Sequence, residues 1–118
     1  MKRNEVVMNI YDTANRLAQE IRQSEEYMNY KMAKQAVNLN SNLKQKIDEF
    51  EKQRYELQLM TMQTGKQDEE KYKKMQELYV ELIEMDDAKK YFEAETKFNI
   101  VVADVNKIIG EAIRDVMQ

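Results

Sequence analysis

The chain has 118 residues, a length that suits one domain or one subunit of an assembly. It contains no Pro, Cys, His or Trp and only 2 Gly, and so few turn residues argue against a β sandwich or barrel. The lack of Cys excludes disulfides, thiolate metal sites and cysteine ligands for iron–sulfur clusters. The lack of His excludes the commonest general base. Its 19 basic and 22 acidic residues give a net charge of −3, so the chain as a whole lacks the basic field typical of duplex-binding proteins.

Helix formers dominate the composition, and apolar residues recur at three- and four-residue steps in the first part of the chain. This spacing predicts a first helix over residues 4–22, with Asn4 as its N-cap. Ser24 is followed by two acids, which are favoured in a first turn, and therefore predicts a second helix over residues 25–38. Asn and Ser residues then mark a break, because their side chains compete with helical hydrogen bonds.

A third helix is predicted over residues 42–64, capped by Ser41 and ended by Gly65, a residue that tolerates a left-handed conformation. Its seam has the spacing of a heptad and consists of Leu43, Ile47, Phe50, Arg54, Leu57 and Thr61. Asp68 and the two acids after it predict a fourth helix over residues 69–85.

The fifth helix, predicted over residues 88–116, has the clearest heptad pattern. Its seam consists of Tyr91, Glu95, Phe98, Val102, Val105, Ile109, Ala112 and Val116. At ~1.5 Å per residue this helix would be about 43 Å long. A compact chain of this size has a diameter of only about 35 Å. The helix should therefore overhang a globular monomer, and we expect it to pair antiparallel with the third helix, which is nearly as long.

The predicted fold class is all-α: a helical bundle or hairpin with long antiparallel helices that dimerises through the seams of those helices. We expect a single domain over residues 1–118. The overhanging apolar stripe needs a partner, which a second copy would supply. The predicted interface between copies consists of Phe50, Leu57, Phe98, Val102, Val105 and Ile109.

Two charged residues interrupt the predicted seams. Arg54 lies between Phe50 and Leu57, and Glu95 lies between Tyr91 and Phe98. A buried charge is tolerated mainly when it is paired, so we predict a buried ion pair between Arg54 and Glu95, within one subunit or across the dimer. The alternative is that each long side chain reaches water from the edge of its seam.

The sequence offers little for catalysis. The two serines, Ser24 and Ser41, occupy expected cap positions, and no His or Cys could activate them. A carboxylate metal site in a helical bundle would need the pattern Glu-x-x-His, which a chain without His lacks. We therefore expect no enzymatic activity, no catalytic residues, no metal and no cofactor.

Binding to nucleic acid or membrane is not expected either. A modest basic patch at Lys31, Lys34, Lys44 and Lys46 is the best case for weak RNA binding, but acids adjoin it and the nearby tyrosines lie on an inner stripe. No apolar run approaches the ~18–20 residues of a membrane span. The N-terminal apolar run is too interrupted for a signal peptide, so a cytoplasmic location is expected.

Two stretches of the sequence, one near each end, form a distinctive pattern. The first comprises residues 10–18 (IYDTANRLA) and 21–27 (IRQSEEY), and the second comprises residues 91–99 (YFEAETKFN) and 103–109 (ADVNKII). Together they resemble the YlbF/YmcA/YheA family. The length and helical character between them match as well, so the resemblance spans nearly the whole chain.

The resemblance implies an all-α, cytoplasmic bacterial protein that forms a homodimer or larger oligomer. Some members are non-enzymatic regulators of competence, biofilm formation and sporulation, in a complex that associates with the endoribonuclease RNase Y. That complex is associated with iron–sulfur clusters held by cysteines, and this chain departs from it because it has no Cys. No catalytic residues carry over.

The leading functional prediction is thus a non-enzymatic regulatory or adaptor protein that acts through protein–protein contacts, linked to RNase Y-dependent RNA processing. Related family members or an RNA-processing complex would be its partners. The alternatives are a homo-oligomeric helical scaffold without a dedicated partner, like the YheA branch, and a weak RNA-binding protein.

Overall fold

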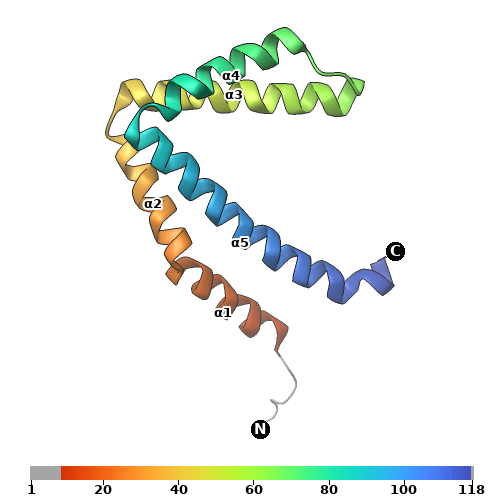
Figure 1. The fold of residues 1–118 in the computed structure, drawn as a ribbon. Coiled ribbons are helices and arrows are strands. Elements are labelled where there is room, and N and C mark those ends of the chain that lie inside the picture. The colour runs from red at the N-terminus through yellow and green to blue at the C-terminus, as the bar shows by residue number, and fades with distance from the viewer. Residues whose placement is uncertain (1–8, 118) are drawn as a thin grey trace.

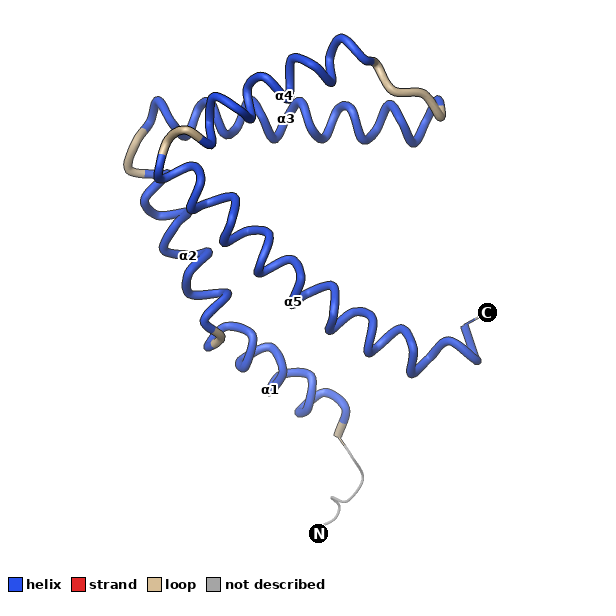
Figure 2. Tube along the Cα trace, viewed as in Figure 1, coloured by secondary structure: helices blue, strands red, loops and turns tan. Residues whose placement is uncertain are grey.

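The computed structural model describes residues 9–117, and this part of the chain contains five α-helices and no strand (Figure 1). The helices are α1 (Ile10–Gln23), α2 (Glu25–Asn38), α3 (Ser41–Thr64), α4 (Glu69–Ile83) and α5 (Asp86–Met117). Figure 2 shows how short the connections between them are. The all-α fold class predicted from the sequence is confirmed.

The first helix begins later than the sequence pattern predicts. Asn9 has an extended backbone (φ −82°, ψ 100°), and its side-chain oxygen accepts hydrogen bonds from the backbone N–H groups of Tyr11 (3.0 Å) and Asp12 (3.2 Å). Asn9 is therefore the N-cap, and the helix starts at Ile10 instead of residue 4. The predicted cap Asn4 lies outside the described residues.

The next two helix starts follow the same capping chemistry. The Ser24 hydroxyl accepts a hydrogen bond from the backbone N–H of Tyr27 at 3.2 Å, and so caps α2 as predicted. At α3 the cap is Asn40, whose side-chain oxygen accepts from the Leu43 N–H at 3.1 Å. The prediction of Ser41 as this cap is wrong by one position, because the Asn side chain next to it satisfies the free N–H instead.

The remaining boundaries are also explained locally. Gly65 adopts the left-handed conformation (φ 72°, ψ 4°) that ends α3, and it suits this position because it has no side chain to clash. Asp68 accepts a hydrogen bond from the Lys71 N–H at 3.1 Å and caps α4. α5 begins at Asp86, before the predicted residue 88, and takes in Asp86 and Asp87 as the acids of its first turn.

The five helices form two arms that meet at a corner. One arm is the hairpin of α3 and α4, and the other is the antiparallel pair of α2 and α5, with α1 continuing beyond α2 (Figure 1). The radius of gyration is 19.3 Å and the extents are 60 × 37 × 16 Å. A compact domain of this length has a radius of gyration of only about 13–14 Å. The protomer is therefore open and elongated.

The predicted antiparallel pairing of the third and fifth helices is wrong. α3 pairs with α4 and α5 pairs with α2, while α3 and α5 diverge from the corner (Figure 1). The cause lies in the connections. A loop of residues 65–68 turns α4 back along α3, and a still shorter turn at residues 84–85 starts α5 at the corner, where α2 already lies.

The hydrophobic core lies at this corner and contains side chains from four helices. It consists of Val37, Leu43, Ile47, Phe50, Leu82, Ala88, Tyr91 and Phe92. Phe92 is central, because its ring lies 5.4 Å from that of Phe50 on α3 and 5.3 Å from that of Tyr79 on α4. Aromatic packing of this kind thus joins the two arms.

Candidate functional site

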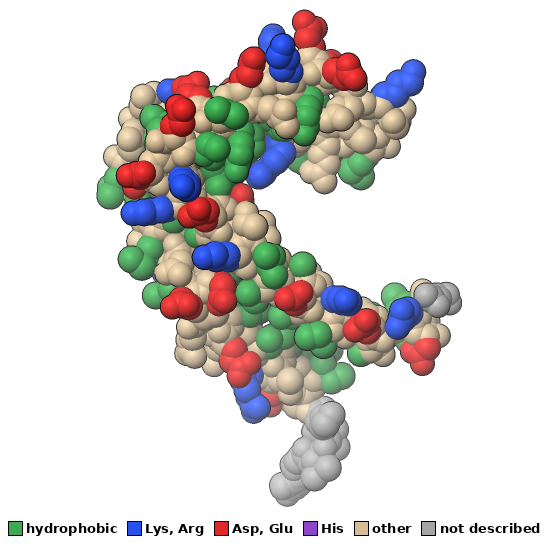
Figure 3. Space-filling view, viewed as in Figure 1, with side chains coloured by type: hydrophobic (Ala, Val, Ile, Leu, Met, Phe, Trp, Pro, Cys, Tyr) green, Lys and Arg blue, Asp and Glu red, His purple; other side chains and the backbone are tan. Residues whose placement is uncertain are grey.

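The C-terminal half of α5 carries an apolar seam that the protomer covers only at one end. Phe98 packs on α2, with its ring 5.8 Å from that of Tyr27 and 5.7 Å from that of Tyr30. Val102 and Val105 are half-buried, and beyond them the apolar residues are exposed. These exposed residues are Ile108, Ile109, Ile113, Val116 and Met117. Figure 3 shows hydrophobic side chains along this arm.

The predicted interface residues therefore divide into two groups. Phe50 and Leu57 are buried inside the protomer, where α4 covers α3, so they are not available to a second copy and their assignment to the interface is corrected. Phe98, Val102, Val105 and Ile109 lie on the partly covered seam of α5, and for them the interface stays a prediction.

α1 has an uncovered apolar face as well. It contains no buried residue, and Ile10 and Tyr11 at its start are largely exposed. Leu17 and Ile21 on the same face are half-buried. The outer end of this arm thus consists of two helices whose apolar sides a single protomer leaves incompletely packed.

The second feature of interest is a polar network at the corner. Arg54 on α3 lies 3.8 Å (Nη1) from Glu95 Oε1 on α5 and 3.9 Å (Nη2) from Glu51 Oε2, and its guanidinium carbon lies 5.3 Å from the centre of the Phe50 ring. The structure thus brings Arg54 and Glu95 together within one protomer. The pair is not fully buried, because the Arg54 side chain is 47% exposed while that of Glu95 is 14% exposed. The Arg54 guanidinium therefore lies over the Phe50 ring at the edge of the core, and the Arg54 side chain stays partly in contact with water.

Two tyrosines complete this network. The Tyr30 hydroxyl donates to Glu95 Oε2 (3.5 Å), and the Tyr91 hydroxyl donates to Glu51 Oε2 (2.9 Å). Burial raises the pKa of both phenols above the ordinary value of 10.0, so they stay protonated and act as donors. Sequence reasoning missed this role and assigned Tyr30 and Tyr91 to inner stripes only. The network links α2, α3 and α5.

Burial also raises the pKa of Glu95 above its ordinary value of 4.5, although Arg54 opposes this effect; the nearby Glu51 charge adds to it. A carboxyl whose pKa is higher in the folded state binds its proton more tightly there, so the stability of the fold decreases as the pH rises through that raised pKa.

We predict that Glu95→Gln removes this pH dependence. Relative to the wild type, the variant should gain stability between pH 4.5, the ordinary pKa, and neutral pH, because Gln carries no charge that must be buried. The measurement is the urea midpoint of wild type and variant at both ends of this range. An equal difference at the two pH values would contradict the prediction.

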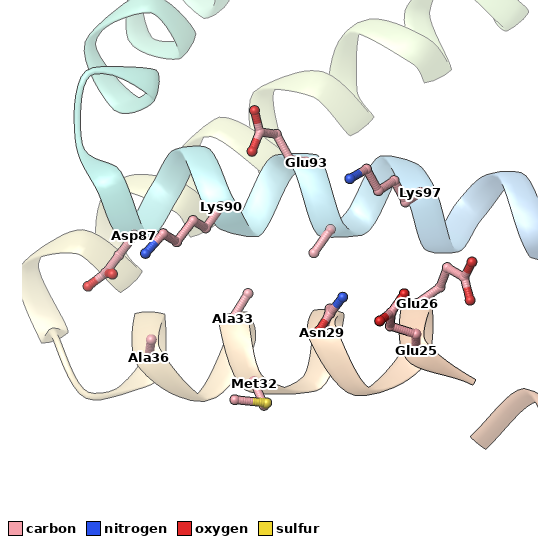
Figure 4. Close-up of a pocket in the computed structure, with 11 residues that line it drawn as sticks. Glu25, Glu26, Asn29, Met32, Ala33, Ala36, Asp87, Lys90, Glu93 and Lys97 are labelled. Carbon is pink, nitrogen blue, oxygen red and sulfur yellow. The ribbon is translucent and has the colours of Figure 1, made fainter. Parts of the chain in front are cut away.

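The outer side of the α2–α5 pair carries an open groove of about 600 Å³ (Figure 4). The small side chains of Ala33, Ala36 and Ala94 line part of it. Its rim mixes acidic and basic residues, namely Glu25, Glu26, Asp87, Lys90, Glu93 and Lys97. This mixture favours no single charge of ligand, and the groove brings no nucleophile and base together.

No group of three or more acidic, His or Cys side chains in the described part of the chain is placed to hold a metal ion. Between residues 9 and 117, no helix has both the length and the apolar character needed to cross a membrane. In the part of the chain that the structure describes, the geometry defines an open all-helical protein with exposed apolar residues along its last helix.

The chain belongs to the Com_YlbF family, whose model is described as control of competence regulator ComK, YlbF/YmcA, and matches residues 10–114. The chain is 36% identical to a UPF0342 protein of Desulfitobacterium hafniense, over 93% of this chain and 89% of that protein. It is 34% identical to a UPF0342 protein of Clostridium novyi, over 92% of this chain and 95% of the relative. The resemblance inferred from the two sequence stretches is confirmed.

Solved structures share the fold. A protein of unknown function (DUF964) from Bacillus stearothermophilus has a TM-score of 0.77 at 16% identity, covering 92% of this chain and 96% of its own. Bacillus subtilis RicA, solved in complex with RicF, has a TM-score of 0.58 at 23% identity with the same coverage.

Proposed function

We propose that this protein is a non-enzymatic regulatory adaptor that associates with itself along the C-terminal half of α5 and contacts a second, helical protein. The observation that carries this proposal is the seam on α5, which is packed on α2 at Phe98 and becomes exposed towards Val116. An apolar face of this extent is typical of a protein–protein interface.

The family supports the regulatory part of the proposal, since its description refers to control of a competence regulator. The structure of RicA, a protein of the same fold, was solved in complex with RicF, which supports a second protein as partner. The finer proposal is that the complex acts in RNase Y-dependent RNA processing, and through it in competence, biofilm formation or sporulation.

A second candidate function is a homo-oligomeric helical scaffold without a dedicated partner. The composition favours it on one point: the chain contains no Cys and so brings no iron–sulfur ligands of its own to a complex. The two candidates share self-association and differ in whether a different protein binds.

Light scattering combined with gel filtration, with and without the purified RNase Y of the same organism, tests the proposal. The adaptor predicts a dimer or larger assembly of this chain, and a heavier complex when RNase Y is added. An assembly whose mass does not change with RNase Y would favour the scaffold and overturn the RNA-processing link. A strict monomer that binds nothing would overturn both.

A further inference from the structure

We infer that a second copy of this chain lies antiparallel along α5, and that the end of its α5 occupies the hollow between the two arms of the first copy. The inference rests on the proposed self-association and specifies its geometry. It is carried by a second stripe on α5, by the direction in which this stripe faces, and by an apolar groove on the opposite arm.

The second stripe lies beside the seam and repeats with the same heptad spacing. It consists of Phe92, Thr96, Asn99, Ala103, Asn106, Gly110, Ile113 and Met117. None of these residues is charged, and all of them from Thr96 onwards are exposed in the protomer. The charged residues of this part of α5 fall outside both stripes, at Lys97, Asp104, Lys107, Glu111, Arg114 and Asp115. The uncharged surface is therefore wider than one neighbouring helix requires.

Phe92 shows which way the second stripe faces. Its ring contacts Phe50 on α3 and Tyr79 on α4, so this side of α5 is turned towards the α3–α4 arm. Residues at heptad spacing drift by only about 20° per heptad around a straight helix, so they stay near one side of it. The stripe beyond Phe92 therefore borders the hollow between the arms, which is visible in Figure 3.

The small residues of this stripe permit a close approach. A Cβ atom added to Gly110 would meet nothing within 4 Å, so no contact inside the protomer explains a glycine at this position. Glycine in the interior of a helix is destabilising relative to alanine. A neighbouring helix that packs against the backbone at Gly110 and Ala103 would explain both small residues.

A second copy is the occupant that fits best, because an uncharged stripe of this kind is complementary to itself. An antiparallel arrangement with Ala103 opposite Gly110 of the second copy places Asn106 close to the two-fold axis, where two Asn side chains can satisfy each other. The same register places Met117 of the second copy beside Thr96, next to the corner.

The α3–α4 arm presents an apolar groove of about 300 Å³ that extends from Arg54 towards the outer end of the arm, where Thr61, Met62 and Met75 are among the residues that line it. Arg54 also lines this groove and reaches Glu95 on α5 (3.8 Å), so the groove opens beside the residue that precedes Thr96. The exposed end of α5 from a second copy, which includes Val116 and Met117, would find apolar surface there.

The absence of Cys from the sequence makes disulfide crosslinking a clean test. Two variant chains are mixed and mildly oxidised. The pair Ala103→Cys and Gly110→Cys tests the antiparallel register of the two α5 helices. The pair Met117→Cys and Thr61→Cys tests whether the end of α5 lies in the hollow between the arms. Each mixture should give a crosslinked dimer of the two different chains. The matched control replaces Thr61→Cys by Glu56→Cys, which lies on the far, exposed side of α3.

Since cysteines bridge only when their Cα atoms come within about 7 Å, Thr61→Cys should give roughly ten-fold more crosslinked dimer than Glu56→Cys. Equal yields would overturn the placement of the α5 end. A dimer by light scattering without the Ala103–Gly110 crosslink would overturn the antiparallel register and leave self-association intact. A monomer by light scattering would overturn the proposed self-association itself.

Discussion

Replacing Ile113 by Asp should convert the assembly into monomers. In the protomer the Ile113 side chain is 43% exposed, so the fold itself tolerates the new charge. Against a second copy the same carboxylate would be buried without a partner, and an uncompensated buried charge costs about 3–5 kcal/mol. The association constant should therefore decrease by at least about 100-fold. Light scattering over a dilution series measures this change.

Ile100→Asp is the matched control. It makes the same substitution on the same helix at a similarly exposed residue (55%), but Ile100 lies among the charged positions, away from both stripes. Its assembly should keep the wild-type mass, and circular dichroism should show both variants fully helical. If Ile113→Asp keeps that mass too, the C-terminal half of α5 is not the contact surface.

Local sequence signals explain where the helices lie. The caps at Ser24, Gly65 and Asp68 depend on residues within three or four positions of the helix end, and the sequence identifies them correctly. For the helices that Asn9 and Asn40 cap, the sequence predicts Asn4 and Ser41 instead. Several polar residues near a helix start compete for the same N–H groups, so local pattern alone does not decide among them.

The sequence predicts which helices pack together less well than it predicts where they begin and end. A heptad stripe shows which side of a helix is apolar, but it does not identify the helix that covers it. Phe50 and Leu57 illustrate this limit, because the same periodicity fits an interface between copies and the actual packing of α3 against α4. Two short connections decide the outcome, and their effect depends on the three-dimensional course of the chain.

The polar network at the corner is likewise predicted only in part. Arg54 and Glu95 stand out in sequence as charges on apolar stripes, and the structure brings them together. The tyrosines do not stand out, since a Tyr on an inner stripe has the pattern of a core residue. Their partners include Glu51, which lies beside the α3 seam, and nothing in its spacing indicates that α5 brings a phenol to it.

Phe92→Ala should be among the most destabilising single substitutions in the protomer. The Phe92 ring packs between the two arms, 5.4 Å from Phe50 and 5.3 Å from Tyr79, and a cavity there would be lined by residues of three helices. Truncating a buried Phe to Ala costs about 3–5 kcal/mol. A domain of this size has only about 5–15 kcal/mol of net stability. Urea unfolding followed by circular dichroism measures the change.

The loss of stability should depend on how much of the side chain is removed and on whether the residue lies at the corner. Phe92→Leu keeps most of the apolar volume and should lose less stability than Phe92→Ala. Tyr55→Ala removes an aromatic ring from the exposed side of α3, away from the corner, and should change stability by no more than about 0.5 kcal/mol. A loss below about 1 kcal/mol for Phe92→Ala would mean that the arms are not held together by this packing, because truncation of a ring in a packed core costs several times more.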